Sequence, residues 1–186
     1  MLNSLIKPLQ LSFPVQNAIL VPTPVARRVA RYAASQELLD LINFQRKQLA
    51  EVGQIADMYE MNWSDDFEKK ASQLSCENIR SPGANYMTAV LYDKLTQSRI
   101  NSGTQKEQEQ ASVETGTIAF GFPPQFKIGC SDLETSCPIV GTASSIVSVC
   151  LIGPSSNWSL DKVNHGAPGS QCSYGKTDNG LCQAPM

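Results

Sequence analysis

The order of secondary-structure signals along this chain of 186 residues predicts an α+β fold. Helical patterns come first, runs rich in β-branched and aromatic residues follow, and a tail rich in cysteine, glycine and proline closes the chain. A chain of this length forms roughly one domain and is long enough to bury a substantial core. Its formal net charge of −2, without a clustered basic face, argues against a nucleic-acid partner.

The first helix is expected from Ser35 to about Ala50. Ser35 is a favourable N-cap residue, and after it five residues, four of them apolar, fall on one helical stripe: Leu38, Leu41, Ile42, Gln45 and Leu49. Gly53 is expected to end this helix. Residues 1–24 contain four prolines and show no periodicity, so we expect them to be extended or disordered.

Two further helices are expected in the middle of the chain. Ser64 is suited to cap the second, because the two aspartates after it complement the positive end of a helix dipole. The third is expected from Asn85 to Gln97, with an apolar stripe formed by Tyr86, Met87, Val90, Leu91 and Leu95. We interpret this stripe as core; the alternative is that it lines a lipid cavity.

Strands are expected only in the second half of the chain. The polar segment Ser98–Thr115 is interpreted as a mobile loop, with a solvated helix as the alternative. Residues Thr117–Phe122 and Ser145–Ile152 have the β-branched and aromatic content of strands, and Phe126–Gly129 is a shorter candidate. From Pro154 onward we expect loops.

An even number of cysteines, concentrated near the C-terminus, predicts a disulfide framework: Cys76, Cys130, Cys137, Cys150, Cys172 and Cys182. Such a framework implies secretion, although Lys7, Pro8 and Gln10 interrupt the apolar core that a signal peptide needs. We give the cysteines more weight and expect an extracellular protein whose N-terminal start is misassigned. No stretch approaches the ~18 uninterrupted apolar residues of a transmembrane helix.

The chain contains one histidine, His165, which lies in a stretch with the composition of an exposed loop. Most metal hydrolases and catalytic triads need a histidine held by packed neighbours, so we expect no catalytic residues, no metal site and no cofactor. Nothing in the spacing of Glu77 and Glu114 supports a general acid–base pair.

Two N-glycosylation sequons occur, at Asn62 and Asn157. Asn157 lies in a predicted loop and is the expected acceptor of a secreted chain. Asn62 is not expected to be modified, because it precedes a predicted helix cap at Ser64 and because Trp63 is expected to anchor the core.

Four segments of the chain, in order, resemble a known family. Residues 39–46 resemble L-x-x-H-N-x-x-R, residues 56–63 resemble A-x-N-M-x-x-L-x-W, residues 122–130 resemble W-x-x-T-x-x-I-G-C, and residues 149–157 resemble V-C-N-Y-x-P-x-G-N. This order and spacing resemble the CAP superfamily, which contains cysteine-rich secretory, antigen 5, venom-allergen-like and plant pathogenesis-related proteins.

The resemblance implies a CAP-type α–β–α sandwich over residues 35–158, preceded by an extended segment, 1–34, and followed by a cysteine-rich extension, 159–186. In it, Asn43 and Arg46 are expected to have structural roles, Asn43 through a buried hydrogen bond to the backbone. As hypotheses for the disulfides, Cys130–Cys137 and Cys172–Cys182 would be local bridges, and Cys76–Cys150 would join the second helix to the sheet.

The departures from the family pattern concern function. The family's metal site uses two histidines and two glutamates, but Gly116 stands where one histidine is expected and residues 76–83 contain none. We therefore expect a secreted, non-catalytic protein that binds a protein partner, from a host or from its own organism. The alternatives are a sterol or fatty-acid carrier with an apolar groove and a degenerate, non-functional family copy.

Overall fold

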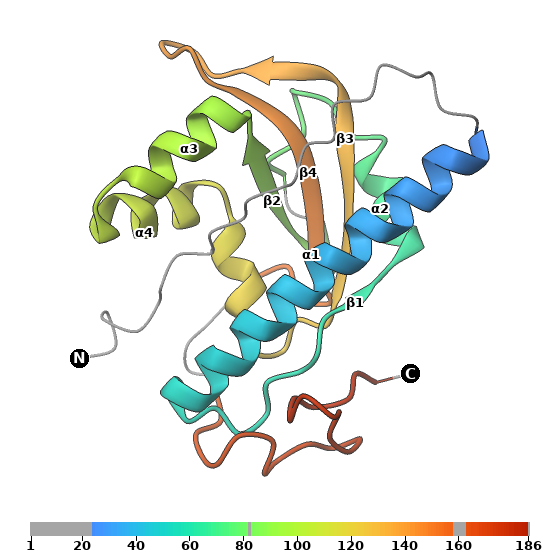
Figure 1. Cartoon of the computed structure of the whole chain (residues 1–186), viewed down its shortest axis with the longest axis vertical. Coiled ribbons are helices and arrows are strands. Elements are labelled where there is room, and N and C mark those ends of the chain that lie inside the picture. Colours follow the sequence, from blue (N-terminus) through green and yellow to red (C-terminus); the bar gives the residue numbers. More distant parts are fainter. Residues whose placement is uncertain (1–23, 82, 158–162, 186) are drawn as a thin grey trace.

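A four-stranded sheet, ordered β1-β3-β4-β2, forms the centre of the molecule in a computed structural model that describes residues 24–81, 83–157 and 163–185, with side chains described from residue 35. Figure 1 shows α1 crossing one face of this sheet and α2 lying on the other. The elements are α1 (Pro24–Gly53), β1 (Asn62–Trp63), α2 (Asp65–Ala71), β2 (Met87–Tyr92), α3 (Lys94–Ser102), α4 (Gln105–Glu114), the 3-10 helix η1 (Thr117–Gly121), β3 (Lys127–Pro138) and β4 (Ser145–Gly153). The predicted α+β class and α–β–α sandwich are confirmed.

The strands β3 and β4 form an antiparallel hairpin, β2 pairs antiparallel with β4, and β1 pairs parallel with β3. Between β2 and β4 the register shifts, so that Tyr92 lies opposite Ile146 while Leu91 lies opposite Ser148. The extra residue, Val147, is a bulge that reverses the alternation of side chains. Ile146 therefore joins the core on the α2 side, whereas Cys150 faces α1.

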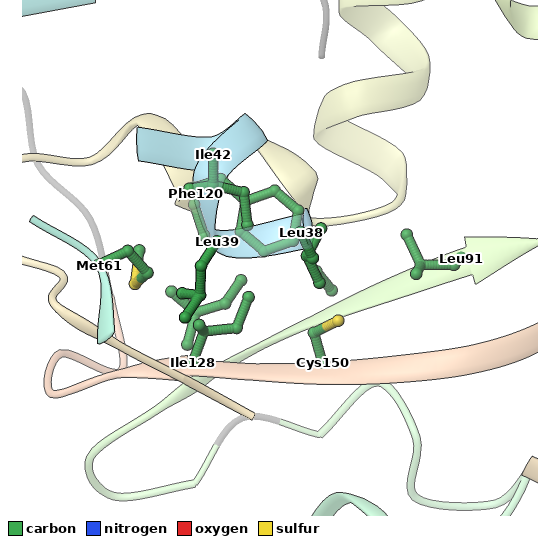
Figure 2. Close-up of a cluster of buried hydrophobic side chains, with 11 residues drawn as sticks. Leu38, Leu39, Ile42, Met61, Leu91, Phe120, Ile128 and Cys150 are labelled. Carbon is green, nitrogen blue, oxygen red and sulfur yellow. The ribbon is translucent and has the colours of Figure 1, made fainter. Parts of the chain in front are cut away.

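Each face of the sheet has its own hydrophobic core. On the α1 face, Leu38, Leu39 and Ile42 of the helix pack over Ile128 and Cys150 of the strands (Figure 2). On the other face, the buried residues of α2 pack on the central strands; this second cluster includes Phe67, Ala71, Val149 and Leu151. Among the described residues, no helix is long and apolar enough to cross a membrane.

The first two predicted helices are present, with one boundary wrong. The first begins at Pro24, well before Ser35, and ends at Gly53 as expected. Proline is tolerated in the first turn of a helix, where its missing N–H is not needed. The rest of the segment predicted to be extended, residues 1–23, lies outside the described part of the chain. In the second helix Ser64 is the N-cap, and its Oγ accepts a hydrogen bond from the Phe67 backbone N–H.

The predicted third helix, Asn85–Gln97, is wrong, because its apolar part is strand β2. Ala89 and Leu91 face the α1 core, while Val90 faces the α2 core. A strand buried on both faces gives a continuous apolar run that periodicity does not distinguish from a buried helix. Leu95, assigned to the same stripe, lies on α3 and is 70% exposed.

Two further assignments are wrong. The segment Ser98–Thr115, interpreted as a loop, contains α4 and most of α3. No residue of α4 is buried, and a capping box between Thr104 and Glu107 supplies a local reason for this polar helix to form. Residues Thr117–Phe122, predicted as a strand, form η1. The predicted strand Ser145–Ile152 is confirmed as β4, and Phe126–Gly129 is the start of β3, which is much longer.

A carboxylate joins α3 to the sheet. Asp93 is the N-cap of α3, accepts a hydrogen bond from the Thr96 backbone N–H at 3.0 Å, and accepts another from the Ser145 backbone N–H at 2.8 Å. These backbone donors, Ser145 first and then Thr96, lower the pKa of Asp93 to about 2. The carboxylate thus remains charged across the physiological pH range.

All six cysteines are paired, as Cys76–Cys137, Cys130–Cys150 and Cys172–Cys182. Only the last pair matches the hypothesis from sequence. Cys130 and Cys137 lie in one extended strand, and at about 3.3 Å per residue their separation along it is far beyond the reach of a disulfide. Cys150 instead lies directly opposite Cys130 on the neighbouring strand, with their Cα atoms 4.0 Å apart.

The C-terminal segment, residues 163–185, completes a third core cluster. Leu181 is buried against Ala50, Ile55 and Met58. The backbone of Cys182 pairs with the chain on both sides of Tyr59: its N–H donates to the Met58 carbonyl, and its carbonyl accepts from Glu60.

One buried cation connects α1 to the loop before β3. Arg46 is 1% exposed and donates five hydrogen bonds, all to backbone carbonyls: those of Tyr59, Phe120, Phe122, Pro123 and Gln125. A guanidinium has five N–H donors, so every one is satisfied. Burial lowers the pKa of Arg46 to about 9, which leaves it protonated at neutral pH.

Three residues earlier, Asn43 holds the chain that leads into β1. Its Nδ2 donates to the Met61 carbonyl at 3.0 Å, and its Oδ1 accepts from the Met61 N–H at 2.7 Å. The expected structural roles of Asn43 and Arg46 are therefore confirmed.

We predict that Arg46→Met destabilises the fold by roughly 3–5 kcal/mol, because the carbonyls of Tyr59, Phe120 and Gln125 lose the donor described for them, whereas those of Phe122 and Pro123 each keep a backbone N–H donor. The matched control is Lys47→Met, at the exposed neighbouring position, which should change the free energy of unfolding by less than about 0.5 kcal/mol. Urea denaturation of the two variants checks this. Equal effects would contradict the role assigned to Arg46.

Peptide mapping without reduction should recover the three pairs described above. In the chain-entropy view the Cys76–Cys137 bridge, with a sequence separation of 61, should contribute about 4 kcal/mol, and Cys172–Cys182, with a separation of 10, about 3 kcal/mol. Paired Cys→Ser variants measured by denaturant unfolding give these values. Recovery of a Cys130–Cys137 peptide would contradict the structure.

Candidate binding surface

Two grooves adjoin at the outer edge of the sheet and share Glu60 and Asn62 as their common ridge. The first, of about 420 Å³, lies between this ridge and α1, and its walls include Gln36, Asp40, Phe44, Lys47 and Asn179. The second, of about 480 Å³, lies between the ridge and the C-terminal segment, and its walls include Trp63, Phe126, Lys127, Thr177, Gln183 and Pro185.

The ridge is positioned by contacts with three parts of the chain. Asn43 holds Met61 from the side of α1, and the Asn62 backbone N–H donates to the Phe126 carbonyl at 2.9 Å. From the C-terminal segment, Asn179 Nδ2 donates to Glu60 Oε1 at 3.1 Å. Segments 119 residues apart in sequence therefore form one surface with a defined shape.

The surface is polar, charge-balanced and partly aromatic. Its carboxylates, Asp40 and Glu60, are matched by the ammonium groups of Lys47 and Lys127. Phe44 is 58% exposed and contributes an aromatic ring to the wall of the first groove. Such a mixture suits an uncharged or mixed-charge polypeptide better than a polyanion.

Aromatic rings line the second groove. Trp63 is half-buried, packs partly against the α1-side core and donates from its indole N–H to Glu68 Oε2 at 2.9 Å. The predicted role of Trp63 as a core anchor is thus only partly met. The ammonium of Lys127 lies 5.6 Å from the centroid of the Phe126 ring, and Tyr59 packs against the same ring.

The structure does not bring the ionisable candidates from the sequence into this surface. His165 is exposed, as expected, and its Nδ1 lies 3.2 Å from the Gly53 carbonyl oxygen. Glu77 and Glu114 are also exposed, and neither lines the two grooves.

The residues present do not fit the metal site that the family resemblance implies. Gly116 has φ +76°, and a Cβ atom added there would lie 2.2 Å from the Thr88 carbonyl oxygen. No side chain, a histidine included, fits at this position without moving the backbone. Within the described ranges, no three His, Cys, Asp or Glu side chains group to hold a metal ion.

Asn157, the expected glycan acceptor, is exposed, and its carbonyl accepts a hydrogen bond from Ser155 Oγ at 2.7 Å. The rest of its sequon, Trp158 and Ser159, lies outside the described residues. The prediction for Asn157 is consistent with this exposure and otherwise stays a prediction.

The comparisons with known proteins show similarity in structure only. No family model matches the chain, and no curated protein matches it in sequence. Among solved structures, it is similar to NaASP2 determined with Zn2+ (18% identity, TM-score 0.52, covering 79% of this chain and 93% of the other). It is similar to hookworm platelet inhibitor with 20% identity and a TM-score of 0.53, covering 80% of this chain and 88% of the other. It is also similar to BmVAL-1 with 15% identity and a TM-score of 0.53, covering 92% of this chain and 100% of the other. At these identities the likeness establishes the fold alone.

We predict that Gly116→Ala is markedly more destabilising than Gly141→Ala. Both glycines have positive φ, so both variants incur the strain of about 1–2 kcal/mol for a left-handed alanine. Only at position 116 does the new Cβ also meet backbone, whereas nothing lies within 4 Å of a Cβ at position 141. Thermal unfolding of the two variants measures the difference; equal losses would contradict the close approach of Gly116 to Thr88.

Proposed function

We propose that this chain, which has the CAP fold, is a secreted, non-catalytic protein that acts by binding a protein partner. The observation that carries the proposal is the composite surface at Glu60 and Asn62. It combines two adjoining grooves, balanced charge and an exposed aromatic ring. Protein interfaces are commonly built around aromatic anchors surrounded by polar groups.

The rigidity of the frame supports binding. The ridge is held by Asn43 on one side and by the disulfide-closed C-terminal segment on the other. A surface that is already in its binding shape loses little conformational entropy on association. This arrangement favours recognition of a partner without a large rearrangement.

A non-catalytic role is supported by the chemistry of the residues. The position expected to supply a metal-binding histidine is Gly116, which has no room for a side chain. The only histidine, His165, is exposed on a loop and accompanied by no carboxylate in its described hydrogen bonds. One neighbour of this fold is named as a platelet inhibitor, a name that describes an inhibitory action and not a reaction.

Extracellular location is supported by the three disulfides, which persist in oxidising compartments. The sterol or fatty-acid carrier, the alternative from sequence, is less well supported. The residues suggested to line its cavity point into two different cores or, in the case of Leu95, into solvent.

We expect Phe44→Ala to weaken capture of the partner roughly tenfold, which is the size of loss typical of an interface anchor. The chain, produced with its disulfides but without N-glycans in a bacterial periplasm, is immobilised and cross-linked to proteins of extracellular fluid. A captured protein is then purified and its Kd measured against each variant. Lys47→Ala and Asn179→Ala, which alter the lining of the first groove, should also weaken binding.

The matched control is Leu95→Ala, which removes an even more exposed apolar side chain, from α3, that lines neither groove. Its Kd should stay within about twofold of the unaltered chain. If Leu95→Ala and Phe44→Ala weaken capture equally, the surface assignment fails. If native mass spectrometry finds a lipid bound and no protein is captured, the carrier function replaces the proposed one.

A further inference from the structure

Asn62 lies in a complete, fully described sequon, Asn62-Trp63-Ser64, at the junction of the two grooves. Its side chain is exposed. The sequence led us to expect otherwise, because a helix cap and a tryptophan follow it directly. The structure shows why these neighbours do not hinder it.

Successive side chains of a strand point to opposite faces, so Asn62 and Trp63 diverge. The indole of Trp63 turns to Glu68, and Ser64 Oγ accepts the N–H of Phe67 at 3.3 Å. Asn62 Nδ2 makes one long hydrogen bond, 3.3 Å, to the Glu60 carbonyl. The folded protein therefore makes little use of the side-chain amide of Asn62.

We propose that Asn62 is an N-glycan acceptor and that its glycan covers the binding surface. In the modification, Asn62 Nδ2 bonds to C1 of the first sugar of a lipid-diphosphate-linked oligosaccharide. The C1–O bond to the diphosphate breaks, the amide loses one proton, and the lipid diphosphate leaves. The product is a neutral amide that keeps one N–H.

The surroundings of Asn62 suit a sugar. The amide groups of Asn179 and Gln183 and the carboxylate of Glu60 line the two grooves and offer hydrogen-bond donors and acceptors to hydroxyl groups. A glycan attached to the ridge shared by both grooves occupies the space that a partner needs. This covering role rests on the proposed function; the modification itself does not.

The modification is tested on the full chain fused to a cleavable signal peptide. The fusion is translated with microsomes in one experiment and secreted from a eukaryotic host in another. Peptide mass spectrometry measures whether the peptide that contains position 62 carries an added mass that a glycanase removes. The proteins compared are the unaltered chain, Asn62→Gln, Asn157→Gln and two Ser64 variants. Ser64→Thr keeps both the sequon and a good N-cap, whereas Ser64→Ala removes both. Asn62→Gln removes the acceptor and leaves the cap intact.

We expect the glycan at Asn62 in the unaltered chain, Asn157→Gln and Ser64→Thr, and its loss in Asn62→Gln and Ser64→Ala. An unmodified Asn62 in both the unaltered chain and Ser64→Thr, in microsomes where no folding or export is required, overturns the proposal.

The covering role is tested with the partner from the capture experiment. Enzymatic trimming of the Asn157→Gln protein, whose remaining glycan is at Asn62, should strengthen binding at least tenfold, toward the Kd of the unaltered chain produced without N-glycans in a bacterial periplasm. Unchanged Kd on trimming overturns the covering role while the modification stands. Failure of the unaltered, glycan-free protein from the bacterial periplasm to bind at all instead counts against the proposed function.

Discussion

The burial of one positive charge, the guanidinium of Arg46, determines how α1 fits against the loop before β3 and against the sheet. The guanidinium of Arg46 lies in the core with five backbone carbonyls around it and no carboxylate among those contacts. A buried charge is tolerated only when its donors are satisfied, so the carbonyls of Tyr59 and of the loop from Phe120 to Gln125 must converge on α1. This requirement fixes the loop that precedes β3, and with it the position of the sheet relative to the helix.

The same helix face also shapes the candidate binding surface. Asn43 lies about one turn before Arg46 and pairs with both backbone groups of Met61, so α1 holds the edge of the sheet through polar contacts to the backbone. Side chains next to these contacts, such as Phe44 and Lys47, are thereby directed to the first groove and take no part in the core. Residues of α1 that hold the fold and residues that line the first groove alternate along a few turns.

How far the sequence predicts this structure depends on whether the relevant signal is local. The cap at Ser64, the end of α1 at Gly53 and the strand β4 follow from local residue patterns and are predicted correctly. The strand β2 is missed because both of its faces are buried, and two disulfides are mispaired because pairing depends on strand register. The grooves could not be predicted, since their walls come from three distant segments, and the exposure of Phe44 is apparent only in the folded structure.

The C-terminal residues that line the second groove are less constrained by the fold than the residues of α1 and the sheet. Between Cys172 and Cys182 the chain is closed by a disulfide of ten-residue separation, and only Leu181 and Cys182 contribute buried side chains to the core from its end. The groove-lining residues Thr177, Gln183 and Pro185 are not buried, and the side chains of the first two donate hydrogen bonds within this segment, to the carbonyls of Leu181 and Lys176. Substitutions at these three positions change no buried side chain, so the shape and charge of this groove wall can change while α1, the sheet and the buried arginine stay as they are.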